Sequence, residues 1–174
     1  LGMIALAWFK NWRLVNILAF SLTAVFFTAW MLLKITSNSL PASGALSFAG
    51  IFYLLFFVMN ILFKLKARDS LNYADYVLLF LNTSLFFGQG MLILEAGHLT
   101  SYRGLFTLVL AVTHLIPFLA LKLTGTGKQA LHLLLLGWTV LFFTIAVPLE
   151  LEGSHIASLW AGEAILLYLI ARKT

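Results

Sequence analysis

The residue whose type and position point most directly to chemistry is Glu163. It stands in the apolar segment SLWAGEAILLYLIA (158–171), eight residues after His155, which is about 12 Å along a helix. An ionised carboxylate at the centre of a membrane-spanning helix costs about 2.5–3.5 kcal/mol on insertion scales. Glu163 is therefore expected to be neutral, paired or open to water. In a functional role it would carry a proton or contact a ligand, and in a structural role it would be a protonated side chain bonded to a neighbouring helix.

Three further side chains are candidates for the surroundings of Glu163. Trp160 precedes it by three residues, which puts the two side chains on one face of a helix. His114, in the apolar segment TLVLAVTHLIPF (107–118), lies at a depth that differs from that of Glu163 by about one helical turn. A Glu–His pair with Asn82 nearby would relay a proton. The alternative is that His114 is a core side chain with a satisfied hydrogen bond.

Two prolines are expected to interrupt helices. Pro117, three residues after His114, would kink its helix and free a backbone carbonyl that His114 or Thr113 could bond. Pro148 begins the segment PLELEGS (148–154), which we predict to be a tight outer turn between two spans.

A second group of acidic and histidine side chains has the residue types of a metal site. Its members are Glu95, His98, Glu150, Glu152 and His155. The spacing Glu-x-x-His occurs twice, but in loops or helix ends, and no His-x-x-x-His accompanies it. Solvated loop charge is the simpler interpretation, so we predict no metal ion and no other cofactor. No serine nucleophile with a base, phosphate-binding glycine loop or pair of catalytic carboxylates is found, and the sequence therefore favours a protein that is not an enzyme.

The elements that must position these residues lie in a membrane. Of the 174 residues, 62% are hydrophobic and 10% are charged, and the mean hydropathy is +1.02. Soluble domains carry about 25% charged residues, and a small one keeps much of its surface in water. The net charge of +5 does not indicate nucleic-acid binding, because the basic residues fall between apolar runs. The chain has no cysteine, which excludes disulfides and thiolate metal sites.

We predict an all-α polytopic membrane protein with six transmembrane helices, arranged as three helical hairpins. The spans cover 12–33, 44–63, 75–94, 102–121, 128–147 and 155–171, each close to the roughly 20 residues that cross a bilayer. Helices are required because backbone polar groups in lipid must bond within their own segment. The apolar stretch LGMIALAWF (1–9) indicates the end of a further helix, so the chain is expected to be a fragment of a longer protein.

Polar residues mark the ends of these spans. Residues 39–44 are expected to turn the first hairpin, and the glycines at 125 and 127 to separate the fourth span from the fifth. Asn72 or Asp75 is predicted to cap the third helix, and Ser154 the sixth. Asn16 and Asn60, which lie within about a turn of a basic loop, are expected to be interfacial or capping groups.

Six spans divide the charged loops between two sides. One side collects nine basic residues and the other two. The nine are Lys10, Arg13, Lys64, Lys66, Arg68, Lys122, Lys128, Arg172 and Lys173, and the two are Lys34 and Arg103. Positive charge concentrates on the cytoplasmic side of membrane proteins, so both ends of the chain are expected there. The basic patch of Lys64, Lys66 and Arg68 is expected to contact anionic lipid head groups on that face.

Three segments suggest an internal repeat. FFTAWMLLK (26–34), FFGQGMLIL (86–94) and FFTIAVPLE (142–150) each end an outward-running span, with their Phe pairs 60 and then 56 residues apart. The pattern indicates three copies of a hairpin, over 12–70, 71–126 and 127–174, within one transmembrane domain. The alternative is coincidence among helices that are all rich in Phe and Leu.

The region around Glu163 resembles a known family. Residues 142–172, together with YRGLFTLVLAVTHL (102–115), are similar to the C-terminal part of the bacterial membrane-protein family called domain of unknown function 2339. Its AxPLxLxGxWxTxxWAxEA-like pattern is matched by Ala146, Pro148, Leu149, Leu151, Gly153, Trp160, Ala161, Glu163 and Ala164. The sequence departs from the pattern at Glu150 and His155, so the resemblance supports no family-wide role for either. It implies a polytopic bacterial inner-membrane protein, usually much longer, and it implies no reaction.

These observations favour a transporter-like or channel-like domain for a small solute or ion, with an intramembrane carboxylate. The alternative is a non-catalytic membrane scaffold or subunit of a larger envelope complex, and lipid or quinone binding is a third possibility. The expected partners are the lipid bilayer and further helices of the same or another chain, and no nucleic acid.

Overall fold

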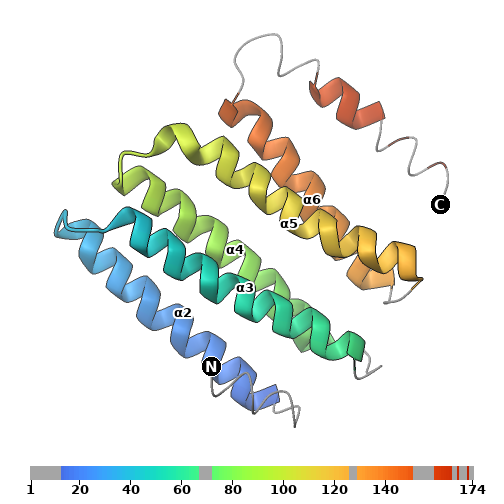
Figure 1. The fold of residues 1–174 in the computed structure, drawn as a ribbon, viewed down its shortest axis with the longest axis horizontal. Coiled ribbons are helices and arrows are strands. Elements are labelled where there is room, and N and C mark those ends of the chain that lie inside the picture. Colours follow the sequence, from blue (N-terminus) through green and yellow to red (C-terminus); the bar gives the residue numbers. More distant parts are fainter. Residues whose placement is uncertain are drawn as a thin grey trace. The chain divides into compact units, whose positions relative to one another are not determined.

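The protein is described by a computed structural model over residues 13–66, 72–125, 129–150 and 159–165, with residues 168 and 172 (Figure 1). This part of the chain is helical apart from short turns, and it contains no strand. The long helices are α2 (Arg13–Thr36), α3 (Ala42–Lys66), α4 (Tyr73–Ala96), α5 (Arg103–Thr124) and α6 (Gln129–Glu150). A 3₁₀ turn, η1 (Thr100–Tyr102), precedes α5, and residues 159–165 are helical as well. The all-α class is confirmed.

Five helices among the described residues are long and apolar enough to cross a membrane. They are Val15–Thr36, Ala42–Ile61, Tyr73–Ala96, Thr100–Thr124 and Gln129–Glu150, with mean hydropathies from 1.8 to 2.2. They coincide with the first five predicted spans to within a few residues at each end. The sixth span, 155–171, falls largely outside the described residues, as does the stretch 1–9. The count of six spans and their arrangement as three hairpins stay predictions.

The helix ends show which of the expected caps form. Asn72 is the N-cap of α4: its side chain accepts a bond from the Asp75 backbone, and the Asp75 side chain accepts one from the Asn72 backbone. This reciprocal pair satisfies two free N–H groups of the first turn. Gly125 ends α5 in the left-handed conformation, at φ 63°, where a residue without a β-carbon is favoured. Ser154 and the glycine at 127 lie outside the described residues.

Two predicted turns are shorter than expected. The first loop ends at Pro41, and α3 begins at Ala42, so Ser43 and Gly44 are helical instead of part of the turn. Proline has no N–H to donate, which makes it compatible with the start of a helix. Pro148 was expected to open the outer turn, but it lies inside α6, which continues to Glu150. A proline this close to the C-terminus interrupts only one backbone bond, to the carbonyl four residues earlier.

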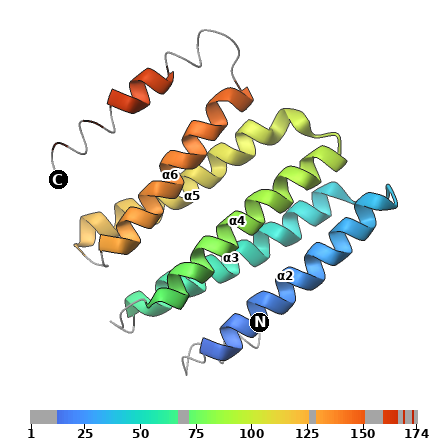
Figure 2. The same ribbon diagram turned by 180° about the vertical axis from the view of Figure 1, so that it is seen from behind.

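The chain divides into two compact units, and the first is Leu1–His98. In this unit α3 packs closely along α4 (Figures 1 and 2). The helix α2 lies beside this pair and contacts it less extensively. One apolar cluster, built on Met31, Ala45, Ala49 and Ile93, joins all three helices. A second cluster joins them through Phe20, Phe56 and Leu78. The exposed sides of the helices carry Leu, Val and Phe side chains.

The second unit is Leu99–Thr174. Here α5 and α6 pack against each other along their lengths, as both views show (Figures 1 and 2). In these two helices Leu110, Leu121, Leu131, Leu135 and Phe142 are almost completely buried. The boundary between the two units, at residues 98 and 99, falls within the predicted second repeat. The division of the chain into repeats stays a prediction.

Candidate functional site

Glu163 lies against α6, and its polar contact is Thr144. The distance from Thr144 Oγ1 to Glu163 Oε1 is 2.5 Å, and the glutamate is half-buried. The indole nitrogen of Trp160 lies 3.5 Å from the backbone oxygen of the same threonine, a long hydrogen bond. Glu163 and Trp160, three residues apart, thus use one face of the helical segment 159–165 to contact a single residue of α6. We call Thr144, Trp160 and Glu163 the Thr144 cluster.

Pro148 explains why Thr144 can accept the indole. In a regular helix the N–H of residue 148 would bond to the carbonyl of residue 144. Proline has no N–H, so this carbonyl lacks its usual backbone donor. Trp160 Nε1 supplies a donor at that oxygen. The proline in the last turn of α6 therefore creates the backbone acceptor that the following helical segment uses.

His114 is packed in the core of the second unit. Its side chain is fully buried, and its Nδ1 is 2.8 Å from the Leu110 backbone oxygen, one turn earlier in α5. The ring lies beside Trp138 and Phe142 of α6, with centroid distances of 6.1 and 5.6 Å. These two rings stack on each other at 5.0 Å. Among the described residues Glu163 contacts Thr144, and its pairing with His114 stays a prediction.

Pro117 lies inside α5, which continues through it to Thr124. The predicted kink at Pro117 stays a prediction. The carbonyl that Pro117 leaves without a donor is that of Thr113, four residues earlier. His114 Nδ1 lies 2.8 Å from Leu110 O, and the Thr113 hydroxyl donates to Val109 O at 2.8 Å. Each of these two side chains bonds the carbonyl one turn before its own residue.

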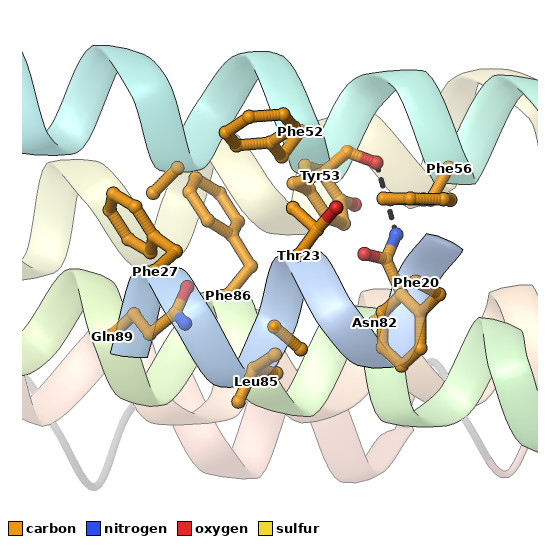
Figure 3. Close-up of a pocket in the computed structure, with 12 residues that line it drawn as sticks. Phe20, Thr23, Phe27, Phe52, Tyr53, Phe56, Asn82, Leu85, Phe86 and Gln89 are labelled. Carbon is orange, nitrogen blue, oxygen red and sulfur yellow. Dashed lines mark hydrogen bonds between the residues drawn. The ribbon is translucent and has the colours of Figure 1, made fainter. Parts of the chain in front are cut away.

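Asn82 belongs to the first unit, where its side chain is buried. Its Nδ2 donates to the Tyr53 backbone oxygen at 3.0 Å and so joins α4 to α3. This bond is drawn as a dashed line in Figure 3. The Tyr53 ring stacks on Phe86 at 4.5 Å with an interplanar angle of 10°. Asn82 therefore holds two helices of the first unit together.

A small cleft opens beside Asn82, between α2, α3 and α4 (Figure 3). Its volume is about 30 Å³, and a water molecule needs about 10–15 Å³, so it can hold about two. Aromatic rings form much of its wall, with a few polar groups among them. The aromatic residues are Phe20, Phe27, Phe52, Tyr53, Phe56 and Phe86, and the polar ones are Thr23, Asn82 and Gln89.

Two hydrogen bonds join α2 to α3 and α4. The sequence analysis predicted neither of them. Gln89 Nε2 donates to Thr28 Oγ1 at 2.8 Å, between α4 and α2. Asn16 Nδ2 donates to Asn60 Oδ1 at 3.4 Å, between α2 and α3. Gln89 follows Asn82 by seven residues, which is two turns, so both amides lie on one helix face. That spacing is a signal by which Gln89 could have been found from the sequence.

A family comparison matches all of this chain. The model of a predicted membrane protein family, domain of unknown function 2339, covers residues 1–174. The chain belongs to this family. The match confirms the family and covers the first seventy residues as fully as the last hundred, where the resemblance is clearest. The comparisons with curated proteins and with solved structures found no match.

The Thr144 cluster contains residues that carry the resemblance to the domain of unknown function 2339. Pro148, Trp160 and Glu163 are separated by up to 15 residues in the sequence pattern, and in the structure each of them acts on Thr144. Pro148 frees the carbonyl, Trp160 donates to it, and Glu163 meets the hydroxyl. Thr144 was not singled out in the sequence, because a threonine in an apolar helix carries no signal by itself.

Among the residues that the structure describes, no three acidic or histidine side chains lie close enough together to hold a metal ion. Glu95 is exposed at the end of α4, and His98 is exposed with a φ of 56°. Glu150, in the last turn of α6, lies against Gly104 near the start of α5, where a β-carbon would collide with it. Glu152 and His155 lie outside the described residues.

The basic patch is described only in part. Lys64 and Lys66 belong to the last turn of α3, and Arg68 lies outside the described residues. Their contact with lipid head groups stays a prediction.

Proposed function

We propose that this chain is a helical scaffold domain of a membrane protein, which positions further helices or partner subunits. The observation that carries this proposal is how the intramembrane polar side chains are used. Asn82, Gln89 and Asn16 in the first unit each bond a different helix from their own, and Glu163 in the second unit bonds α6.

Such bonds are suited to fixing how helices are arranged. Lipid tails are as apolar as leucine, so apolar burial does not drive helices together in a bilayer. A side-chain hydrogen bond between membrane helices contributes about 0.6 kcal/mol on average and at most about 1.7. Two of the three bonds in the first unit join α2 to the closely packed α3–α4 pair, and together they contribute about 1–3 kcal/mol to holding α2 in place.

The outer faces of the helices support the same proposal. α2 and α3 expose large apolar residues along much of their length, including Leu22, Val25, Phe26 and Ile51. Such faces contact lipid or other helices in a membrane. The family is one of predicted membrane proteins, and a domain in which several polar side chains join neighbouring helices while apolar faces are exposed is suited to assembly.

The experiment compares assembly with transport in the same variants. Asn82→Leu and Gln89→Leu remove two of the bonds between helices, while Ser84→Ala is the control, because the Ser84 hydroxyl bonds Phe80 O within α4. The two leucine variants are expected to lower the thermal stability of the full-length membrane protein and its co-purification with partner subunits. Proton flux into vesicles should not exceed that of protein-free vesicles.

A second candidate is the transport of a small solute or ion, and the cleft of the first unit favours it. Asn82, Gln89 and Thr23 are polar groups at a cleft that can hold about two water molecules. Its test is flux measured in the same vesicles. Flux above the protein-free rate that Glu163→Gln abolishes, with thermal stability unchanged, would replace the scaffold proposal by a transport function.

We propose the topology that the charges indicate, with six spans and both ends of the chain in the cytoplasm of a bacterial inner membrane. The lipid partners would be anionic head groups at Lys64, Lys66 and Arg68. Because the chain has no cysteine, a single introduced cysteine is the one thiol that a labelling reagent can modify, and its reaction shows on which side of the membrane the residue lies. Asn38→Cys should react with an impermeant maleimide added outside, and Lys66→Cys only after the membrane is opened. The reverse order would overturn the topology.

A further inference from the structure

We infer that the cleft of the first unit binds two water molecules, which form a hydrogen-bonded chain between the side-chain amides of Asn82 and Gln89. Thr23 of α2 is the third polar group that the waters contact. This assigns a ligand to the cleft, which the scaffold role leaves open, and it does not depend on that role.

The two amides have more hydrogen-bonding capacity than their bonds to the protein use. A primary amide has two N–H hydrogens and an oxygen with two lone pairs. Asn82 uses one hydrogen for the Tyr53 backbone oxygen, and Gln89 uses one for Thr28 Oγ1. Among the described residues neither amide makes a second hydrogen bond. Asn82 is 4% exposed and Gln89 7%, and both line the cleft, which is where their remaining polar groups can find partners.

The position of these amides in the span makes such partners necessary. Asn82 lies about 14 Å from the start of α4, and Gln89 about 10 Å from its end. Lipid tails offer no hydrogen bond at this depth, and a buried amide group without a partner costs free energy. Water molecules bound in the cleft remove that cost for both amides at once.

The volume of the cleft and the spacing of the amides both point to two waters. The volume is about 30 Å³, and one water needs about 10–15 Å³. Asn82 and Gln89 are two turns apart, about 10.5 Å along α4. A chain of amide, two waters and amide contains three hydrogen bonds of about 2.8 Å each and spans about 8.4 Å, which side-chain reach extends to the spacing. A single water would span only about 5.6 Å and could not join the two amides.

Thr23 lies where such a chain would pass. The helices α2 and α4 run in the same direction (Figures 1 and 2), and the bond between Thr28 and Gln89 sets their relative depth. Thr23 is five residues before Thr28, about 7.5 Å along α2, and Figure 3 shows it between the two amides. Among the described residues Thr23 makes no hydrogen bond, whereas Thr113 donates to a carbonyl of its own helix. The Thr23 hydroxyl can therefore both donate to a water and accept from one.

The rest of the lining decides the class of ligand. None of the residues that line the cleft in the described part of the chain is charged, which favours a neutral ligand. The small volume excludes molecules much larger than two waters. The competing occupant is the end of a lipid acyl chain, which fits the aromatic wall but leaves Thr23, Asn82 and Gln89 without partners. Water satisfies all three.

Solid-state NMR of the full chain in lipid bilayers tests the ligand. Magnetisation is transferred to the side-chain amide nitrogens from water protons, and in a separate measurement from lipid acyl protons. The two amide signals are assigned by their loss in Asn82→Leu and Gln89→Leu. In the wild type both amides should receive magnetisation from water. The control is Trp138 Nε1, which is buried in α6 and does not line the cleft, and it should receive none.

Variants of α2 and α4 test the place and the chain. Ala24→Leu puts an apolar side chain into the cleft and should abolish the transfer from water at both amides. Ala29→Leu, the same change at an exposed position of α2 outside the lining, should keep it. Thr23→Val keeps the shape without the hydroxyl and should reduce the transfer at both amides. Asn82→Leu should also reduce it at Gln89, because the two waters hold each other.

Three results would overturn the inference. Transfer from acyl protons with none from water would show that lipid occupies the cleft. Transfer from water that neither Ala24→Leu nor Thr23→Val changes would place the water elsewhere. Transfer from water to only one of the two amides in the wild type would exclude the chain.

Discussion

The hydrogen bond from Gln89 Nε2 to Thr28 Oγ1, 2.8 Å long, is expected to be a main attachment of α2. Of the five candidate spans, α2 has the smallest share of buried residues, so more of its attachment must come from polar bonds. We predict that Gln89 and Thr28 are coupled by about 0.6–1.7 kcal/mol, the range measured for such pairs in membranes.

The two single changes should differ in cost. Gln89→Leu keeps the volume of the side chain, and the Thr28 hydroxyl can then turn to the carbonyl of Ala24, as Thr139 does toward Leu135. Its cost is about 0.6 kcal/mol. Thr28→Val leaves the buried Gln89 amide without its partner, and an unmade bond of this kind costs about 1–3 kcal/mol. Because Gln89 lines the cleft, where water can replace the partner, we expect a value of about 1 kcal/mol.

Reversible unfolding in mixed detergent micelles measures these free energies for wild type, both single variants and the double variant. The coupling energy is the sum of the two single losses minus the loss in the double variant. Thr113→Val is the matched control, since that hydroxyl bonds Val109 O within its own helix and its effect should add to that of Gln89→Leu. A Gln89–Thr28 coupling below about 0.3 kcal/mol, within ordinary additivity, would refute the role of this bond.

The same unfolding assay checks three further changes. Gly104→Ala should cost at most about 1 kcal/mol, because the Glu150 side chain in its way can rotate, and Glu150→Ala should remove that cost. His114→Leu keeps the core volume and should cost less than about 1.5 kcal/mol, whereas His114→Ala opens a cavity and should cost about 2–5; equal losses would contradict a packing role. Asn72→Ala should cost about 0.5–2 kcal/mol, and Asn72→Ser should restore most of it if the cap is what matters.

The helices themselves could be predicted because the bilayer acts on each segment separately. A span must be long and apolar, and its backbone must bond within itself, whatever its neighbours are. Five of the predicted spans are therefore found within a few residues of their expected limits. The cap at Asn72 could also be predicted from the sequence, because capping is an interaction between residues three positions apart.

The contacts between helices could not be predicted in the same way. Glu163 was identified because a carboxylate in an apolar run is costly, but its contact residue, Thr144, is one of many hydroxyl residues in apolar helices. His114 was considered as the partner of Glu163 because of its depth, yet its ring packs between α5 and α6 beside Trp138. The depth of a residue in the membrane fixes its position only along the helix axis. It does not determine which way the helix is rotated or which helix lies beside it.

The sequence by itself determined that this is a helical membrane protein, where its spans lie, and that Glu163, Trp160 and Pro148 form part of a family pattern. Each of these properties depends on local composition or spacing. Only the tertiary structure decided that the three residues act together on Thr144, and that Asn82 and Gln89 fasten neighbouring helices. The reason is that these contacts arise between surfaces of separate helices, where a rotation of one helix by a single residue would replace every partner.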